Sequence, residues 1–226
     1  MMPTYPPILA QPGADAPLPA AGALSPAPQE AENLAPLHAF VTALGALLGP
    51  GGPQGEEAAQ RIRPLLARLI ARDDWLPAEF ARPGAQRYQQ YLLHCDSAER
   101  FSIVSFVWAP GQGTPIHDHR VWGLVGVLRG QERAEHFTRA PDGSLRATGS
   151  SVLAAGEIEI LSPEAGDIHR VSNALAQAPS VSIHVYGGNI GWVERAIYAP
   201  DGREQRFVSG YANSRLPNLW QRPAEQ

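Results

Sequence analysis

The sequence predicts a mainly β protein with an N-terminal helical lead-in. After Arg100, short runs rich in valine, isoleucine and aromatic residues alternate with turn residues, at a spacing of roughly 8 to 12 residues. Pro-Asp-Gly stands between two such runs at 141–143 and again at 200–202, and this tripeptide is typical of hairpin turns. Many short strands joined in this way indicate a sandwich or a closed barrel.

Residues 1–32 are expected to form a flexible leader. Up to residue 29 they carry one charge, Asp15, and they are dense in proline and alanine. Because proline fixes φ and removes a hydrogen-bond donor, this stretch is unsuited to a helix or a β-ladder. The first residues lack a positively charged region, so they do not indicate a signal peptide.

Residues 33–87 are expected to form the helical lead-in. Apolar residues recur at helical spacing over 33–48, where Gly49-Pro50 supplies a stop, and again over 56–72. We assign residues 88–226 to the barrel. Its candidate strands are 101–108, 122–128, 132–138, 151–154, 157–161, 167–171, 180–186, 192–198 and 205–208.

The composition excludes several classes of function. All 18 positive charges are arginines, so the chain has no lysine for imine chemistry, for pyridoxal-phosphate attachment or for a lysine-containing phosphate loop. A net charge of −4 argues against a nucleic-acid partner, and no apolar run reaches the ~20 residues that a membrane span needs. Cys95 is the only cysteine, which excludes an internal disulfide and fits a cytoplasmic location.

Three histidines form a candidate metal site. His117 and His119 are two residues apart, so on an extended segment both imidazoles leave the same face. His169 follows after a hairpin, and neighbouring strands would bring it to the other two. Three neutral imidazoles suit a divalent transition metal with open coordination sites. The alternative is that two alternating histidines occur on a strand by chance. His136 is interpreted as a structural or surface histidine.

The surroundings of these histidines resemble the two cupin motifs. The matching residues are Gly111, His117, His119 and Gly130 for the first motif, and Gly156, Pro163, Gly166, His169 and Asn173 for the second. The resemblance implies a double-stranded β-helix, a small jelly-roll barrel. Most cupins carry a glutamate shortly after the second histidine, where this chain has Gly123 and Leu124. A three-histidine Fe(II) site keeps its full positive charge and favours an anionic co-ligand such as a thiolate.

A second polar group lies on the predicted strand 180–186. Ser182, His184 and Tyr186 occupy alternate positions, so their side chains share one face, while valine and isoleucine occupy the other. Both faces are therefore expected to be covered, with the polar face in the barrel lumen. A relay of the three side chains would satisfy their hydrogen bonds mutually. The alternative is a hydrogen-bonded ladder without chemistry.

Taken together, the motifs resemble the cysteine dioxygenase family of thiol dioxygenases over roughly residues 88–220. They are P-I-H-D-H at 115–119, G-D-I-H-R-V at 166–171 and S-I-H-V-Y at 182–186. The resemblance implies one Fe(II) per chain held by His117, His119 and His169, with dioxygen as co-substrate. It also implies that Ser182, His184 and Tyr186 form an outer-sphere relay.

Two departures discriminate within that family. Mammalian-type enzymes have a cysteine crosslinked to the relay tyrosine where this chain has Gly123, and a carboxylate-binding arginine where it has Gln90. Glutamine cannot form a charged bidentate clamp. The glutamine variant resembles the bacterial branch that oxidises 3-mercaptopropionate, in which Arg195 stands at the place of a candidate carboxylate partner. The alternative for Arg195 is a surface arginine at the barrel rim.

These observations predict a non-haem iron thiol dioxygenase that adds both atoms of dioxygen to the sulfur of a small thiol carboxylate. The expected substrate is 3-mercaptopropionate and the product is a sulfinate. The alternatives are a cysteine dioxygenase, a mercaptosuccinate dioxygenase, and a non-catalytic ligand-binding or sensor cupin. The sequence leaves the oligomeric state open.

Overall fold

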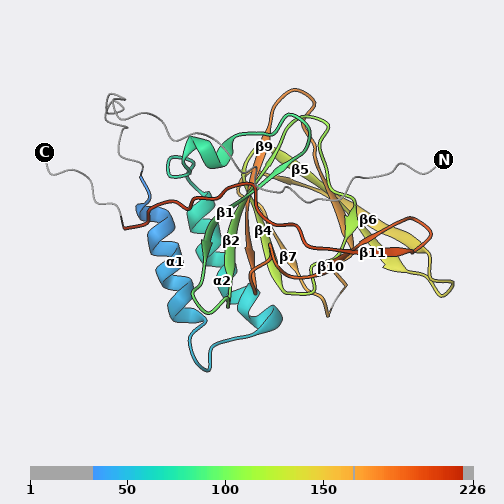
Figure 1. Cartoon of the computed structure of the whole chain (residues 1–226), viewed down its shortest axis with the longest axis horizontal. Coiled ribbons are helices and arrows are strands. Elements are labelled where there is room, and N and C mark those ends of the chain that lie inside the picture. The colour runs from blue at the N-terminus through green and yellow to red at the C-terminus, as the bar shows by residue number, and fades with distance from the viewer. Residues whose placement is uncertain (1–32, 165, 221–226) are drawn as a thin grey trace, which may run out of the picture.

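The computed structural model describes residues 33–164 and 166–220, so the predicted leader lies outside the described residues. Two helices precede a β structure made of two antiparallel sheets (Figure 1). None of the helices in the described ranges combines the length and the apolar character that a membrane crossing requires.

The elements follow one another as two helices, a 3₁₀ turn and eleven strands in the described residues. They are α1 (Ala35–Leu47), α2 (Gly55–Ile70), η1 (Ala78–Ala81), β1 (Gln89–Cys95), β2 (Ser102–Trp108), β3 (Ile116–His117), β4 (Gly123–Arg129), β5 (Gln131–Arg139), β6 (Leu145–Ala154), β7 (Ile158–Leu161), β8 (His169–Asn173), β9 (Ser180–Tyr186), β10 (Arg195–Tyr198) and β11 (Glu204–Phe207).

One sheet has five strands in the order β1-β2-β9-β4-β7, and the other has six in the order β11-β10-β3-β8-β5-β6. Strands that are distant in sequence lie side by side, as β2 does with β9 and β3 with β10. This interleaving of early and late strands is the arrangement of a double-stranded β-helix, and the predicted mainly β cupin fold with its helical lead-in is confirmed.

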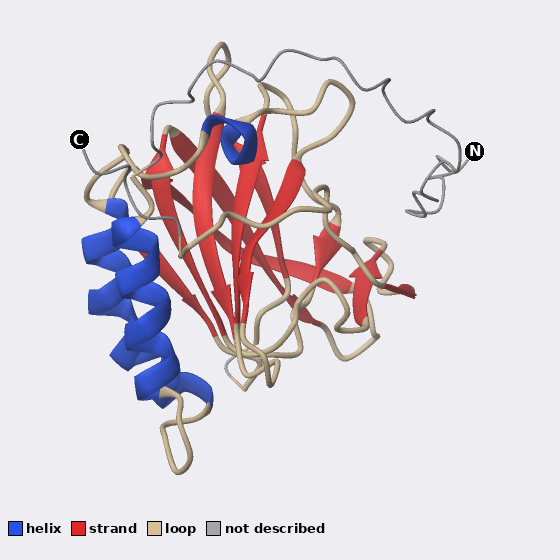
Figure 2. Cartoon of the chain, turned by 60° about the vertical axis from the view of Figure 1, so that its left-hand side comes forward, coloured by secondary structure: helices blue, strands red, loops and turns tan. Residues whose placement is uncertain are grey.

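The two helices cover the outer face of the five-stranded sheet (Figure 2). Leu37 and Leu44 of α1 and Ile62 and Leu66 of α2 are fully buried in one apolar cluster with residues of β2, β4 and β9. The helix approaches the sheet so closely that a Cβ at Gly126 on β4 would lie 3.0–3.2 Å from the side chains of Ile70 and Leu66. Glycine at this position therefore permits the packing of α2.

The opposite face of the same sheet looks into the barrel. On β9, Val181, Ile183 and Val185 belong to the cluster under the helices, while Tyr186 belongs to a second cluster in the interior. All seven residues of β9 are buried, because both faces are covered. The strict alternation of apolar and polar residues thus places Ser182 and His184 inside the barrel, as expected.

Three differences from the predicted strands have physical reasons. β1 was missed because Gln89–Cys95 lacks β-branched residues and shows no regular alternation of burial. β3 has only two residues, too few for any periodicity. β6 is longer than expected, since Leu145–Ala154 is an exposed edge strand whose polar residues are held by pairing with β5.

Candidate metal centre

Three histidine side chains converge inside the barrel. His117 on β3 is the direct antiparallel partner of His169 on β8, and His119 follows β3 by two residues. Their ring centroids are 4.8, 4.8 and 4.9 Å apart. One ring nitrogen of each lies within 4.8 Å of the others, and all three side chains are buried. The adjacent strands thus bring together the three residues expected from their spacing.

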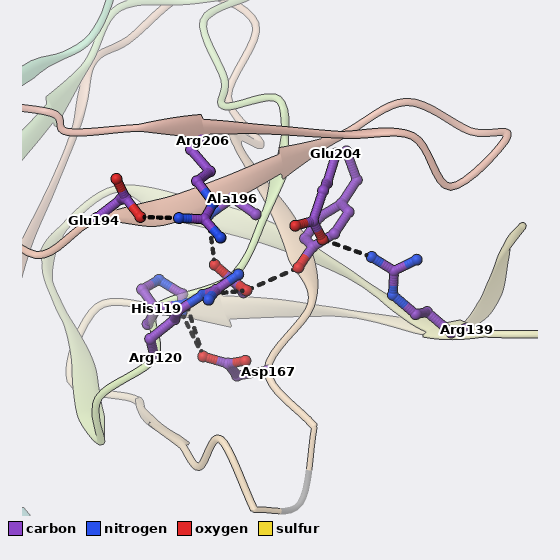
Figure 3. A network of polar contacts seen from close by, with 10 residues as sticks. His119, Arg120, Arg139, Asp167, Glu194, Ala196, Glu204 and Arg206 are labelled. Atoms are coloured by element: carbon purple, nitrogen blue, oxygen red, sulfur yellow. Dashed lines mark hydrogen bonds and ion pairs between the residues drawn. The ribbon is translucent and has the colours of Figure 1, made fainter. Parts of the chain in front are cut away.

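Hydrogen bonds orient two of these rings. Nδ1 of His117 lies 3.0 Å from the carbonyl oxygen of Pro115, which can only accept, so Nδ1 carries the proton and Nε2 has a free lone pair. Nδ1 of His119 lies 3.2 Å from Oδ2 of Asp167, and that carboxylate also accepts the backbone N–H of His119 at 2.8 Å. Figure 3 shows Asp167 beneath His119. A carboxylate behind a histidine in this way is typical of metal ligands.

Burial keeps the three imidazoles neutral. It lowers the pKa of His117, His119 and His169 well below the ordinary value of 6.5, and the neighbouring rings and Arg195 lower the pKa of His119 and His117 further. A neutral imidazole is the form that binds a metal ion. No carboxylate belongs to this group of three, so the donor set among the described residues consists of nitrogen alone.

A second possible metal group shares His169. It adds His136, whose ring lies 6.3 Å from that of His169, and Glu159, whose Oε1 is 3.4 Å from Nε2 of His136. These side chains line a cavity of about 210 Å³. Nδ1 of His169 is buried and has no hydrogen-bond partner among the described residues. His136 was expected to be structural or at the surface, but the structure places it half-buried beside a candidate ligand.

The three alternate residues of β9 form a continuous hydrogen-bonded chain. Oγ of Ser182 lies 2.8 Å from Nε2 of His184, and Nδ1 of His184 lies 2.8 Å from the Tyr186 hydroxyl. The His184 ring stacks on Phe106 at 4.1 Å, and burial lowers its pKa to about 3. The Tyr186 ring stacks on His119 at 5.6 Å, and burial raises the pKa of the phenol. The hydrogen-bonded series therefore ends at Tyr186, a protonated tyrosine beside the histidine cluster.

Gln90 and Arg195 meet at a third residue, Ser209. Nε2 of Gln90 lies 3.1 Å from the Ser209 hydroxyl and an Arg195 guanidinium nitrogen lies 2.6 Å from it, so both donate to the same oxygen. Gln90 also donates to the carbonyl of Gly210 at 3.0 Å. The Arg195 guanidinium lies over the ring of Phe207 at 4.8 Å. The structure thus joins Gln90, which replaces the carboxylate-binding arginine of the mammalian-type enzymes, to Arg195, the candidate carboxylate partner.

Arg195 is buried rather than at a barrel rim, with 3% of its surface exposed. It forms no ion pair with any carboxylate of the described residues, and its Nε has no hydrogen-bond partner among them. Its positive charge acts on the site. It partly opposes the rise that burial causes in the pKa of Tyr186, and it adds to the fall that burial causes in the pKa of His119. A buried guanidinium without a carboxylate partner is costly unless a ligand supplies one.

Asp118, between the two histidines, ties their loop to β10. Its carboxylate accepts the backbone N–H of Ala196 and the hydroxyl of Tyr198, both at 2.8 Å, and Nε of Arg120 at 3.2 Å. Asp118 therefore points away from the histidine cluster and fixes β10 at Ala196, the residue after Arg195. Ala196 and Arg120 are both labelled in Figure 3.

Gly123 lies directly against the relay tyrosine. It is the antiparallel partner of Tyr186, and a Cβ at this position would lie 2.9 and 3.1 Å from two carbons of the Tyr186 ring. This is the position of the crosslinked cysteine in the mammalian-type enzymes that the sequence resembles. The single cysteine, Cys95, is at the end of β1 on another strand and contacts the backbone of Asp96.

Sequence reasoning missed Ser209, Asp167 and Glu132. Ser209 becomes relevant only through tertiary contacts with Gln90 and Arg195. Asp167 stands two residues before His169, within a motif that the sequence reasoning used only for its glycine and histidine. Glu132 is fully buried on β5. The sequence could have indicated it, because a glutamate at an inward-facing position of a predicted strand is unusual.

Comparison with known proteins supports the resemblance over part of the chain. No protein-family model matches the chain. Over 117 residues it is 29% identical to cysteine dioxygenase type 1 of Danio rerio, which covers 50% of this chain and 56% of the relative. The chain therefore matches about half the length of that curated relative.

Among solved structures, the chain is similar to an uncharacterised protein with a double-stranded β-helix domain from Klebsiella pneumoniae. That structure is 20% identical, covers 53% of this chain and 95% of the other, and gives a TM-score of 0.42. A cupin superfamily protein from Desulfitobacterium hafniense is 14% identical, covers 52% and 94% of the two chains, and gives a TM-score of 0.39.

Proposed function

We propose that this chain is a non-haem iron thiol dioxygenase that converts 3-mercaptopropionate to the corresponding sulfinate. One observation carries the proposal: Arg195 is a buried guanidinium with no ion-paired carboxylate among the described residues, and it lies near enough to the three neutral histidines to lower the pKa of His117 and His119. A metal centre without a carboxylate ligand favours an anionic sulfur donor, and an unpaired guanidinium favours a carboxylate. A small thiol carboxylate supplies both.

The donor set fits Fe(II). Three buried neutral imidazoles with nitrogen atoms within 4.8 Å of one another suit a divalent transition metal that keeps open coordination positions. His117, His119 and His169 would hold one ion per chain. When bound, the iron supplies a Lewis acid that favours the thiolate form of a thiol and a redox centre for dioxygen. Both oxygen atoms pass to sulfur, and sulfur itself supplies the electrons that reduce dioxygen.

The protein side chains bind and orient the substrate. Arg195 would pair with the carboxylate, and Ser209 holds the guanidinium in place by accepting one of its N–H groups at 2.6 Å. Gln90 shares that hydroxyl and adds no charge. Tyr186, held by His184 at 2.8 Å, presents its hydroxyl beside His119 and would hydrogen-bond the substrate or the oxygen. Phe106 and Trp108 line the apolar interior and exclude water.

The charges around the pocket favour 3-mercaptopropionate over cysteine. Cysteine brings an ammonium group, whereas Arg195 already places a buried positive charge near the three histidines. Two acidic residues near the histidines in sequence are engaged elsewhere, Asp118 by β10 and Asp167 by His119. The second candidate is cysteine dioxygenase, because the curated relative carries that name. Mercaptosuccinate, whose two carboxylates would compete for Arg195, is a further candidate.

The proposal extends to the organisation of the chain. We assign residues 88–226 to the catalytic barrel, 33–87 to a helical layer that covers one sheet, and 1–32 to a leader. A single cysteine is consistent with the cytoplasm, which is where we place the enzyme. The partners are the thiol and dioxygen, without nucleic acid or membrane.

Steady-state oxygen uptake by the iron-loaded protein with a panel of thiols tests the substrate assignment. We expect 3-mercaptopropionate to give a larger kcat/KM than L-cysteine and mercaptosuccinate, and cysteamine to be poor because it lacks a carboxylate. A tenfold preference for cysteine would transfer the assignment to cysteine dioxygenase. Tight binding of a thiol carboxylate without oxygen uptake would instead favour a non-catalytic ligand-binding or sensor cupin.

A further inference from the structure

Glu132 is a buried carboxyl group to which the proposed reaction gives no role. It is on the inward face of β5 with none of its surface exposed, while its neighbours Gln131 and Arg133 are exposed. Burying a carboxylate is costly unless hydrogen bonds offset the loss of water. A leucine would fill the same space without this cost, so the glutamate at this position requires an explanation beyond packing.

Glu132 lies at the serine end of the relay. Ser180 donates to its Oε1 at 3.1 Å, and the Ser182 hydroxyl and the Trp108 indole are near enough to lower the pKa of the carboxyl. Oε2 of Glu132 and Nε1 of Trp108 form no hydrogen bond of ordinary geometry with any described residue. A buried carboxylate oxygen without a donor is stabilised when a nearby hydroxyl donates a hydrogen bond to it. The Ser182 hydroxyl is such a donor, and it also lies 2.8 Å from Nε2 of His184.

The hydrogen bonds of the relay can run in either of two directions. His184 is neutral, because burial lowers its pKa to about 3, so only one of its ring nitrogens carries a proton. Nε2 faces Ser182 and Nδ1 faces Tyr186, each at 2.8 Å. Each hydroxyl has a single proton to donate, so the direction of one hydrogen bond fixes the direction of the next.

The protonation state of Glu132 selects between these directions. An ionised Glu132 only accepts, so Ser182 donates to it and accepts from Nε2–H of His184. Nδ1 then accepts the Tyr186 proton, and the phenol presents only lone pairs to the metal centre. A proton on Glu132 releases Ser182 to donate to Nε2. Nδ1–H then donates to the Tyr186 oxygen, and the phenol proton is directed to the metal centre.

We propose that Glu132 is the fourth member of the relay, a positioning residue whose proton decides whether Tyr186 donates or accepts at the metal centre. The catalytic consequence rests on the proposed function. The two ends of this hydrogen-bonded relay, Glu132 and Tyr186, interact electrostatically, since the charge of Glu132 raises the pKa of Tyr186.

Both states of Glu132 are populated near neutral pH. Burial raises the pKa of its carboxyl to about 7, against the opposing effect of the nearby donor groups of Ser182, Ser180 and Trp108. Glu159 on β7 raises the pKa further. The imidazoles of His184 on β9 and His169 on β8 are neutral and bring no charge, and His136 is the other titratable side chain on the inward side of β5.

The tautomer of His184 reports the direction of the relay without any turnover. We would load the full chain with zinc(II), which is diamagnetic, and follow the ring nitrogens of isotope-labelled histidine by NMR, with His184→Gln to assign the signal. As the pH rises through about 7, we expect the proton to move from Nδ1 to Nε2. An infrared band of a protonated buried carboxyl should disappear with the same midpoint. A single tautomer over this range in the wild-type protein would overturn the proposal.

The matched variants are Glu132→Gln and Glu135→Gln. Glu135 is on the same strand and pairs with Arg170 at 2.8 Å outside the barrel. We expect Glu132→Gln to abolish both the tautomer change and the infrared band, and Glu135→Gln to keep them. A tautomer change that survives in Glu132→Gln would assign the titration to another group and contradict the proposal.

Turnover separates this inference from the proposed function. For the iron-loaded enzyme, kcat should depend on pH around 7 in the wild type and lose that dependence in Glu132→Gln, with KM little changed. If no thiol is turned over but the tautomer still changes, the proposed function fails while the role of Glu132 in setting the relay stands. If thiols are turned over and the tautomer is fixed, the inference about Glu132 fails alone.

Discussion

Arg195 donates a hydrogen bond of 2.6 Å from its guanidinium to the hydroxyl of Ser209. The two residues come from β10 and from the segment after β11, and the same hydroxyl accepts a hydrogen bond from Gln90 on β1. The guanidinium is thereby held by a neutral partner, and its charge is left for a ligand. This arrangement is the basis of the substrate assignment.

Replacing Arg195 with glutamine should weaken the binding of a thiol carboxylate. A hydrogen bond to a charged group contributes about 1.5–3 kcal/mol, which corresponds to roughly a 10- to 100-fold rise in KM for 3-mercaptopropionate. Oxygen uptake measures this rise, and cysteamine, which has no carboxylate, should show no such change. Arg206→Gln is the control, because Arg206 is exposed on β11 and pairs with Glu194 at 2.8 Å. Equal losses for both thiols would argue that Arg195 acts on the fold instead.

Tyr186→Phe should lower turnover while iron stays bound. The variant keeps the ring that stacks on His119 and removes only the hydroxyl that His184 holds at 2.8 Å. Loss of a positioned proton donor or acceptor costs roughly a hundredfold or more in kcat. Elemental analysis of the purified variant together with its kcat checks both statements. A loss of iron in Tyr186→Phe would show that the tyrosine supports the metal site itself.

Asp167→Asn should weaken metal binding. The carboxylate holds Nδ1 of His119 at 3.2 Å and the backbone N–H of the same residue at 2.8 Å. Removing such a partner of a metal-binding histidine lowers metal affinity by roughly 10- to 100-fold. Competition with a chelator of known affinity measures the change, with Asp142→Asn on an exposed turn as the control. An unaltered affinity would mean that the ring of His119 is oriented by the fold alone.

Leu66→Ala should destabilise the barrel together with the helices. Leu66 is fully buried between α2 and β4, where it approaches Gly126 closely. Deletion of a buried leucine side chain costs about 2–5 kcal/mol of unfolding free energy. Urea unfolding measures this cost, and Leu65→Ala, at a half-buried position of the same helix, should cost less. Separate transitions for helices and sheets would show that the helical layer does not fold as one unit with the barrel.

The sequence was most informative where a pattern is local and strict. The alternation in Ser180–Tyr186 predicted the strand and its inward face, because a period of two leaves only one way to bury the apolar residues. The spacing of His117 and His169 predicted that adjacent strands would bring them together, and they are direct partners. These predictions needed no knowledge of the remaining topology.

The remaining features depend on contacts between distant segments. Gln90 and Ser209 are 119 residues apart in the chain, and nothing in the local sequence of either indicates the other. The role of His136 beside Glu159 follows from the pairing of β5 with β8, which sequence periodicity does not specify. β3 escaped detection because two residues carry no periodicity.

Isotope-labelled dioxygen tests the central claim most directly. The protein, purified without oxygen and loaded with iron, is given 3-mercaptopropionate and labelled dioxygen, and the product is analysed by mass spectrometry. The proposed function predicts stoichiometric iron and a sulfinate in which both oxygen atoms carry the label. Stoichiometric zinc after purification, with no oxygen consumed on any thiol of the panel by the iron-loaded protein, would contradict it.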